Sequence, residues 1–414
     1  MDASLVDGLW AGYDSFCALG LDLDLTRGKP SAEQLDLSEA LLSLPGPGIH
    51  HDGCGTDIRN YGGLDGLPEL RAIFAELLGV PVEQLLALGN ASLTLMHDAL
   101  AYACLWGVPG SPRPWGREPI KFLCPTPGYD RHFALCEAFG IEMIAVPNLP
   151  DGPDVEAVAA LAVADPDIKG LWVVPTYANP DGSTISEDAA RRLAAMPTAA
   201  PDFRIFWDNA YFAHHLTAVE TPTVNILALA AAAGNPDRPL LFASTSKMTF
   251  PGAGVAFFAG SPANATWYRQ HLSKQAIGPD KVNQLRHVMF LRDANGVRAH
   301  MRRHREILAP KFAAVDRALT ERLGAPGSSG ATWTRPRGGY FVSLDVLPGT
   351  AGRVVELAAN AGVALTPAGS THPYGRDPLD SNIRLAPSMP PLPEVEQAMK
   401  VVALCVALAA AEAN

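Results

Sequence analysis

Short, uninterrupted apolar runs recur through the middle of this 414-residue chain, and most of them are followed by Pro, Gly or Asn. The runs occupy residues 121–124, 141–146, 168–174, 203–207, 240–243 and 254–259. Because they are apolar throughout rather than at alternate positions, they predict strands buried on both faces. Helix-like segments, such as 132–139, 155–163 and 187–195, separate several of them. This alternation predicts an α/β fold with a mainly parallel sheet in a large domain.

The pattern changes after about residue 283. A long helical stretch rich in arginine comes first, and Pro/Gly-rich turns with short strands at 339–346 and 383–385 follow it. A chain of this length usually divides into two cores. We predict a large domain over residues 46–283 and a smaller α+β domain built from residues 1–45 and 284–414. The Arg and His side chains of segment 301–311 are interpreted as a solvated face.

Composition narrows the classes of function. With 32 Lys+Arg against 43 Asp+Glu the net charge is −11, which disfavours a nucleic-acid partner. The longest apolar stretch, 401–411, is about half of the ~20 residues that span a bilayer, so we expect a core helix and no membrane segment. Six scattered cysteines without a CxxC pair predict reduced thiols in a cytoplasmic protein. Neither adjacent histidine pair, at 50–51 and 214–215, has metal-ligand spacing, so no metal site is expected.

Three polar residues follow apolar runs and should meet at one edge of the sheet. Asp208 follows run 203–207, Lys247 lies in the turn Ser-Thr-Ser-Lys, and Asn179 lies in an Asn-Pro-Asp-Gly turn. Ligands of parallel sheets gather at the carboxyl ends of strands. A lysine withdrawn from water can act as an amine nucleophile on a carbonyl. Alone, the lysine could equally be a solvated charge and the aspartate a helix or turn cap.

The motifs VVPTYANPDG, WDNAY and STSK, in this order and spacing, resemble those of the pyridoxal-phosphate aminotransferases of fold type I. TRGKP, RNYGGLDG, GNASLTLMHD, PGYDRHF and NIRLAPS are similar to a divergent bacterial aspartate aminotransferase subgroup, often labelled MocR-type. The resemblance runs from Thr26 to Met389, which is most of the chain. It implies the fold type I architecture and pyridoxal 5'-phosphate as cofactor.

The resemblance also implies the residues around the cofactor ring. Lys247 would bind the cofactor covalently through its amine and later move a proton at the substrate Cα. Asp208 would face the pyridine nitrogen and keep it protonated. Asn179 and Tyr211 would hydrogen-bond the phenolic oxygen. Tyr129 would stack on the ring, although it could also be an ordinary core tyrosine.

The phosphate would lie at the start of a helix predicted at 94–106. Backbone amides near Ala91, with the hydroxyl groups of Ser92 and Ser244, would form an anion site in the favourable direction of the helix dipole. The alternative is that Ser92 only caps its own helix. Tyr61 would reach the phosphate from a neighbouring subunit, which implies a homodimer with shared active sites.

Substrate contacts follow from the same resemblance. Arg384, in NIRLAPS, would bind the α-carboxylate through the paired donors of its guanidinium. The turn at Gly28 and Lys29 would lie over the substrate, since glycine permits a close backbone approach. Asn179 would contact the substrate as well as the cofactor.

Two features of the site are left open by the sequence. Lys29, Arg27 and Arg286 are all candidates for binding a distal carboxylate. The better-known aminotransferases have an arginine about eight residues after the lysine, which pairs with the phosphate. Here segment 250–255, after Lys247, contains no basic residue.

The expected activity is transfer of an amino group between an L-amino acid and a 2-oxo acid, with aspartate and 2-oxoglutarate favoured by the resemblance. One alternative is the same cofactor acting on another amino acid, by aromatic or aminoadipate transamination or by β-elimination. Another is a non-enzymatic, MocR-like ligand-sensing domain. Such a regulator needs a basic DNA-binding module, whereas residues 1–26 contain five Asp and no Lys or Arg.

Overall fold

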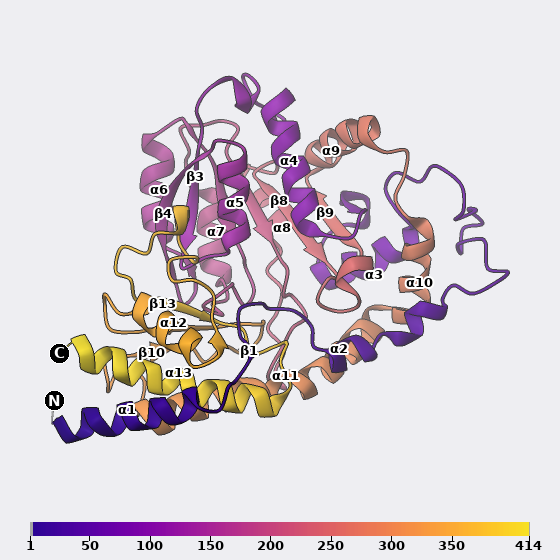
Figure 1. Ribbon diagram of the computed structural model, residues 1–414. Helices are drawn as coiled ribbons and strands as arrows, with labels where there is room; N and C mark the ends of the chain where they lie inside the picture. Colours follow the sequence, from indigo (N-terminus) through magenta and orange to yellow (C-terminus); the bar gives the residue numbers. More distant parts are fainter. Residues whose placement is uncertain (1–2, 414) are drawn as a thin grey trace.

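The computed structural model describes residues 3–413 and is built around an eight-stranded sheet (Figure 1). In spatial order its strands are β2 (Leu85–Ala87), β9 (Ala256–Gly260), β8 (Pro239–Ser244), β7 (Arg204–Asp208), β6 (Ile168–Val173), β3 (Lys121–Thr126), β4 (Glu142–Leu149) and β5 (Gly152–Pro153). The five strands from β8 to β4 are parallel. The pairs β2–β9, β9–β8 and β4–β5 are antiparallel. The predicted α/β fold with a mainly parallel sheet is confirmed.

Side chains of the central strands enter two separate cores, one on each face of the sheet. In β7, Phe206 packs on one face and Trp207 on the other. In β8, Leu240 and Phe242 share the core of Phe206, whereas Leu241 lies with Trp207. Successive side chains of a strand point to opposite faces, so a strand covered on both faces must be apolar throughout. The uninterrupted apolar runs have this origin.

Helices cover both faces. Those on the Trp207 face are α3 (Pro68–Leu78), α6 (Val155–Ala164), α7 (Glu187–Ala195) and α8 (Ile226–Ala232). Those on the Phe206 face are α4 (Ser92–Trp106), α5 (Asp130–Ala138) and α9 (Pro262–Gln275). Three of them correspond to the predicted segments 132–139, 155–163 and 187–195, with ends shifted by at most two residues. The sheet is therefore the middle of three layers (Figure 1).

A third core holds the remaining part of the chain together. It contains the sheet β10 (Thr332–Trp333), β11 (Val342–Asp345) and β13 (Asn382–Leu385), the pair β1 (Leu23–Asp24) and β12 (Val363–Ala364), and the helices α1 (Ala3–Cys17), α12 (Ala351–Asn360) and α13 (Leu392–Ala413). The apolar stretch 401–411 belongs to α13, whose inner side chains are buried in this core, as predicted. Among residues 3–413, no helix combines the length and hydropathy that crossing a membrane would require.

Two consecutive helices, α10 (Lys281–Leu291) and α11 (Ala294–Leu323), connect the cores. Val297 of α11 packs in a core of the large sheet, and Leu319 packs in the third core. The expectation of a solvated face over 301–311 is wrong for His304 and Lys311, because each is only 1% exposed. His304 and Lys311 lie on the face of α11 that packs against other elements, whereas Arg302 and Arg303 are exposed, as expected. The division of the chain at residue 283 stays a prediction.

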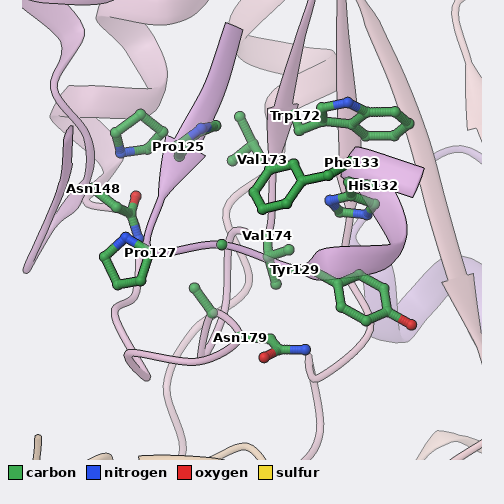
Figure 2. A pocket seen from close by; sticks show the side chains of 13 residues that line it. Pro125, Pro127, Tyr129, His132, Phe133, Asn148, Trp172, Val173, Val174 and Asn179 are labelled. Carbon is green, nitrogen blue, oxygen red and sulfur yellow. The ribbon is translucent and has the colours of Figure 1, made fainter. Parts of the chain in front are cut away.

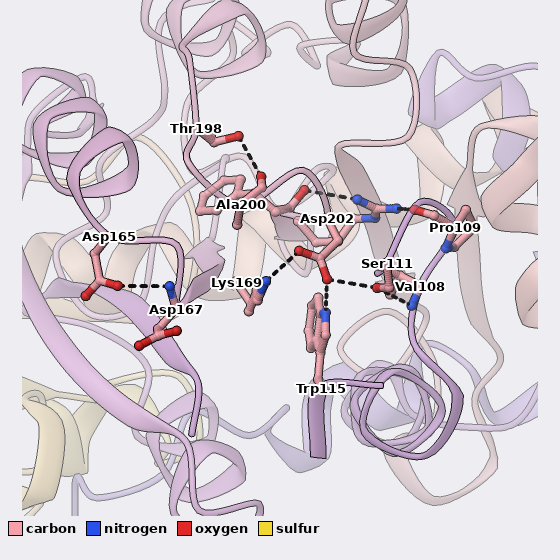
Figure 3. Close-up of polar contacts among 12 residues, drawn as sticks. Val108, Pro109, Ser111, Trp115, Asp165, Asp167, Lys169, Thr198, Ala200 and Asp202 are labelled. Atoms are coloured by element: carbon pink, nitrogen blue, oxygen red, sulfur yellow. Dashed lines mark hydrogen bonds and ion pairs between the residues drawn. The ribbon is translucent and has the colours of Figure 1, made fainter. Parts of the chain in front are cut away.

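Polar side chains lie at both ends of the parallel strands. The carboxyl ends of β6, β7 and β8, at Val173, Asp208 and Ser244, share one edge of the sheet. At the opposite edge, buried Asp202 accepts hydrogen bonds from Lys169, Trp115 and Ser111 at 2.7, 2.8 and 2.9 Å (Figure 3). Burial opposes ionisation of Asp202, but these donors hold its pKa below the ordinary value. Ionic and hydrogen-bonded groups therefore close the amino end, while the carboxyl end is open.

Candidate active site

A cleft lies at the carboxyl edge of the large sheet, where the N-terminal segment and the third core meet it. Its lining residues are Thr26, Arg27, Gly28, Lys29, Tyr129, Asp130, Arg131, Asn179, Tyr211, Lys247, Phe341, Thr366, Pro367 and Arg384. Seven residues predicted from the sequence are among them: Gly28, Lys29, Tyr129, Asn179, Tyr211, Lys247 and Arg384. Thr26 and Arg384, which are 358 positions apart, therefore come together in one cavity.

Lys247 lies in the loop that follows β8. Its Nζ is 4.8 Å from the centroid of the Tyr211 ring. Burial lowers the pKa of Lys247, and the negative charge of Asp208 acts in the opposite direction. Burial also raises the pKa of Tyr211 well above its ordinary value. An amine with a lowered pKa is more readily deprotonated, which is the form that attacks a carbonyl.

Asp208 ends β7 and is 2% exposed. Its Oδ2 lies 3.0 Å from Nε2 of His132, and the His132 ring stacks on Trp172 with centroids 4.3 Å apart (Figure 2). Its other oxygen, Oδ1, is buried and has no hydrogen-bond partner among the described residues. A buried carboxylate oxygen without a partner is costly, so this atom is suited to accept a hydrogen bond from a ligand.

Tyr129 and Asn179 lie on the same side of the site as Asp208. Tyr129 immediately precedes α5, and its ring meets His132 edge-on at 4.9 Å. Figure 2 shows Tyr129, His132 and Asn179 around one hollow between β3, β6 and α5. Burial raises the pKa of Tyr129, so its hydroxyl stays protonated. An aromatic side chain and an amide thus border this hollow together with His132, which contacts Asp208.

Helix α4 begins at Ser92, two residues earlier than predicted. Its N-cap is Ala91, which has no side chain to bond the first amides, and the first turn has no acidic residue. The alternative that Ser92 caps its own helix is therefore not observed. Ser244 Oγ donates to Ser246 Oγ at 3.0 Å, and Ser246 Oγ donates to the carbonyl of Asn90 at 3.3 Å. These bonds connect the loop of the lysine with the free amides of α4.

Arg384 lies on β13 and is 7% exposed. Its Nη1 donates to Asp130 Oδ1 at 2.9 Å and lies 3.5 Å from Asn179 Oδ1. Its guanidinium lies 5.1 Å from the centroid of the Phe341 ring. Nε is buried without a hydrogen-bond partner among residues 3–413. A Cβ on Gly28 would come within 2.3 Å of the Phe341 ring, so only glycine allows this segment to cross there.

Basic side chains border the cleft. Arg27, Lys29 and Arg131 are exposed lining residues, and none forms an ion pair within residues 3–413. Arg286, the third candidate for a distal carboxylate, lies on α10 and is not part of the lining. Tyr61 is 80% exposed and does not line the cleft of its own chain.

Sequence reasoning did not predict Thr26, Phe341, Thr366 and Pro367 of the cleft lining. It also missed three consecutive residues, namely Asp130 and Arg131, which line the cleft, and His132, which contacts Asp208. These three lie inside the motif PGYDRHF, which was used only for Tyr129. Residues three apart at the start of a helix share a face, so the spacing of Tyr129 and His132 carried a signal that was available. No comparable signal pairs Asp130 with Arg384, because the two are 254 positions apart.

The chemical properties of the side chains and amides described above fit one small molecule. An amine of lowered pKa suits an aldehyde, the unpartnered Asp208 Oδ1 suits a protonated ring nitrogen, and Tyr129 suits a flat heterocycle. The free amides at the start of α4 suit a phosphate. Pyridoxal 5'-phosphate carries all four groups.

Fold and site together define a pyridoxal-phosphate-dependent aminotransferase of fold type I, as the sequence resemblance implied. More narrowly, residues 2–414 match the model of the aspartate amino-transferase family, and the chain belongs to that family. The wider similarity to solved structures and curated relatives agrees with this class.

Among its relatives, the chain is 55% identical to an aspartate aminotransferase of Corynebacterium glutamicum over 97% of this chain and 92% of that protein. A crystal structure of an aspartate transaminase from the same organism superimposes with a TM-score of 0.97 at 52% identity, covering all of this chain and 98% of that one. An α-aminoadipate aminotransferase of Thermus thermophilus, solved with N-(5'-phosphopyridoxyl)-L-leucine, shares the fold at a TM-score of 0.75 and 21% identity, covering 95% and 94% of the two chains.

Proposed function

We propose that this aminotransferase exchanges amino groups between L-aspartate and 2-oxoglutarate. The observation that carries the proposal is the charge of the cleft: Arg384 lies inside it, and Arg27, Lys29 and Arg131 border it without ion-pair partners in the described chain. In a protein of net charge −11, such a cationic cleft favours substrates with two carboxylates. The names of the Corynebacterium relatives support the same substrate.

In this proposal Lys247 and Asp208 act at the reacting centre. When bound, pyridoxal phosphate supplies a cationic ring that withdraws electrons from the substrate Cα. Lys247 would hold the cofactor through its amine and, once the substrate amine has displaced it, would move the proton between the substrate Cα and the cofactor carbon. Asp208 keeps the ring nitrogen protonated through Oδ1, while His132 fixes the carboxylate through Oδ2. Because Asp208 is 2% exposed, water does not weaken this interaction.

Other cleft residues orient the cofactor. Tyr129 would lie against one face of the ring, and Asn179 and Tyr211 would donate to its phenolic oxygen. The high pKa of Tyr211 keeps its hydroxyl protonated and able to donate. Amides near Ala91 and the hydroxyl groups of Ser92 and Ser244 hold the phosphate, with the helix dipole contributing the positive potential that an arginine gives elsewhere.

The α-carboxylate binds Arg384, and Gly28 lies over the substrate. Asp130 holds Nη1, so the edge formed by Nε and Nη2 remains available for two parallel hydrogen bonds. The distal carboxylate is bound among the three bordering cations, with Lys29 and Arg27 on the segment that carries Gly28. Asp130 is the only acid among the lining residues of the described chain, so a dicarboxylate meets little repulsion.

The test is a visible absorption titration of the purified holoenzyme. L-aspartate should convert the spectrum of the bound cofactor, and 2-oxoglutarate should restore it. Lys247→Ala should lose the borohydride-reducible link while keeping the fold. L-phenylalanine, which lacks a distal carboxylate, serves as the control amino acid and should convert the spectrum at much higher concentration.

A spectrum that responds to L-phenylalanine or L-2-aminoadipate and not to aspartate would reject the proposed substrate while leaving the cofactor assignment intact. A Lys247→Ala variant with an unchanged reducible link would reject Lys247 instead.

We also propose a homodimer with shared active sites. Tyr61 lies in the segment between η1 (Glu39–Ser43) and α3, which extends away from the body of the molecule (Figure 1). Lys281 Nζ donates to the carbonyls of Asn60 and Gly62, both at 2.7 Å, and so fixes the backbone on either side of Tyr61. Mixing the inactive variants Lys247→Ala and Tyr61→Ala should restore activity, because each hybrid dimer regains one complete site. If hybrid dimers are shown to form and activity does not recover, shared active sites are excluded.

A cytoplasmic location is proposed on the six free cysteines, which suit a reducing compartment.

A further inference from the structure

The backbone carbonyl of Lys247 accepts two hydrogen bonds from buried side chains. Tyr340 Oη donates to it at 3.1 Å and His214 Nε2 at 3.3 Å. Tyr340 is fully buried and lies just before β11 of the third core, whereas His214 is 2% exposed and follows β7. The two donors thus hold one atom of the lysine backbone from two segments that are 126 positions apart in the chain.

Tyr340 is itself held from the N-terminal segment. Gln34, on α2 (Ala32–Asp36), donates from Nε2 to Tyr340 Oη at 2.9 Å and lies 2.9 Å from Nδ1 of His304. Its Oε1 accepts the amide of Ser31 at 3.0 Å, which closes the capping box of α2. Both ends of the Gln34 amide are therefore used, and Gln34 has no exposed surface. Because both ends of this buried amide are hydrogen-bonded, the position of the Gln34 side chain is fixed.

The next carbonyl along the chain is held in the same way. His300 Nε2 lies 2.8 Å from the carbonyl of Met248, and its ring meets His304 at 4.7 Å. Burial lowers the pKa of His214 and His300, and that of His304 to about 3, so these groups are neutral at physiological pH. They hold the backbone beside Lys247 without adding charge to the cleft.

We propose that Tyr340 and Gln34 are positioning residues that fix the backbone of Lys247, so that only its side chain moves during the reaction. Gln34 lies six residues after Gly28, on the same N-terminal segment, and Ser388 Oγ donates to the carbonyl of Lys29 between them at 2.9 Å. The N-terminal segment that lies over the cleft is therefore the same segment that holds the lysine backbone through Gln34 and Tyr340. The inference rests on the role of Lys247 in the proposed function.

The test compares Tyr340→Phe with Tyr13→Phe. Tyr13 is also buried, and its Oη donates to a backbone carbonyl, that of Leu357, at 2.9 Å, but it lies in the third core away from the cleft. Each variant loses one tyrosine-to-carbonyl hydrogen bond, and Tyr340→Phe also loses the bond that Gln34 donates to it. Both should bind the cofactor fully, and Tyr340→Phe should lose more stability to urea than Tyr13→Phe.

Only Tyr340→Phe should shift the pH midpoint of the cofactor's visible absorption, by about half a unit or more, and lower kcat about tenfold with little change in KM. Identical midpoints and kcat values in the two variants would overturn the proposal. A Tyr340→Phe variant that lacks the reducible link altogether would overturn the proposal that Tyr340 only positions the backbone, whereas the assignment of Lys247 is tested separately by Lys247→Ala.

A second pair of variants tests the proposal independently, in case Tyr340→Phe does not fold. Gln34→Met removes the donor to Tyr340 and half of the capping box, whereas Ser31→Ala breaks the capping box and leaves Gln34 facing Tyr340. The midpoint shift should appear in Gln34→Met and be absent from Ser31→Ala. A shift of equal size in both would mean that α2, rather than the contact with Tyr340, is responsible.

Discussion

Arg384 shows how one neighbouring carboxylate can prepare a binding group. Asp130 occupies Nη1, and Phe341 supports the guanidinium plane, so rotation of the group is restricted before any substrate arrives. Nε is buried without a partner and is suited to an incoming carboxylate oxygen. A preorganised donor pair costs less conformational entropy on binding than a mobile one.

We therefore expect Arg384→Lys to behave very differently from a conservative change. Lysine keeps the charge but cannot reproduce two parallel bonds, and the loss should be about 2–3 kcal/mol of substrate binding, or roughly a hundredfold in KM for aspartate. Steady-state kinetics, with cofactor content as the control, measure it. A KM within threefold of wild type would show that the α-carboxylate binds elsewhere.

At the scale of one element, the start of α4 combines free amides with a missing cap. Helix stability and cofactor binding make opposite demands here, because a carboxylate at this position would satisfy the helix but repel a phosphate. Ala91 at the N-cap and Ser92 at the first helical position leave the amides to a ligand.

Ser92→Asp should separate these two demands. In the cofactor-free protein the helix should gain a few tenths of a kcal/mol up to about 1 kcal/mol, because the new charge favours the helix dipole. Affinity for pyridoxal phosphate should fall at least about tenfold, through repulsion and loss of the amides. Thermal unfolding of the cofactor-free form and a cofactor titration measure the two effects, with Ser92→Ala as control. Undiminished affinity in Ser92→Asp would place the phosphate away from α4.

The amino edge of the sheet should affect stability without affecting the reaction. Asp202 has no exposed surface, and Asp202→Ala would leave Lys169 without its partner and Trp115 without an acceptor. The expected loss is about 3 kcal/mol in the free energy of unfolding. Activity per folded molecule should stay unchanged, because the cluster lies at the edge opposite the cleft. Urea unfolding with kinetics on the folded fraction checks both, and a large fall in kcat would contradict this separation.

Across the whole molecule, buried neutral histidines make stability depend on pH. Burial lowers the pKa of His287 to about 4 and that of His304 to about 3, whereas both titrate near 6.5 in the unfolded chain. Below pH 6.5 the unfolded chain binds protons that the folded chain does not. Stability is therefore complete above pH 6.5 and is lost progressively as pH falls toward these lower values.

Each such histidine should lower the free energy of unfolding by about 2 kcal/mol between pH 6.5 and 5. Urea titrations at pH 7 and pH 5 measure the loss. His304→Gln should reduce the difference in the free energy of unfolding between pH 7 and pH 5 by about that amount, whatever the absolute stability of the variant. An unchanged difference would show that His304 is not neutral in the folded protein.

The sequence alone was sufficient to predict the main strands of the large sheet and the edge of that sheet where the site lies. Apolar runs predicted six strands of the sheet, because a strand covered on both faces leaves a local signature. Lys247, Asp208 and Asn179 were brought to one edge by the rule that parallel strands end together. Seven of the cleft residues were identified from motifs, six of them beside recognisable strands or helices and Arg384 within a short strand.

Only the tertiary structure decided how distant segments meet. Asp130 with Arg384, and Gln34 with Tyr340 and His304, are pairs more than 250 positions apart, and nothing local marks them. The histidines of α11 resembled a solvated face because their neighbours are charged, yet His304 is buried by the N-terminal segment. Local patterns report which face of an element is apolar, whereas the partner of a buried polar group depends on which segments the completed fold brings together.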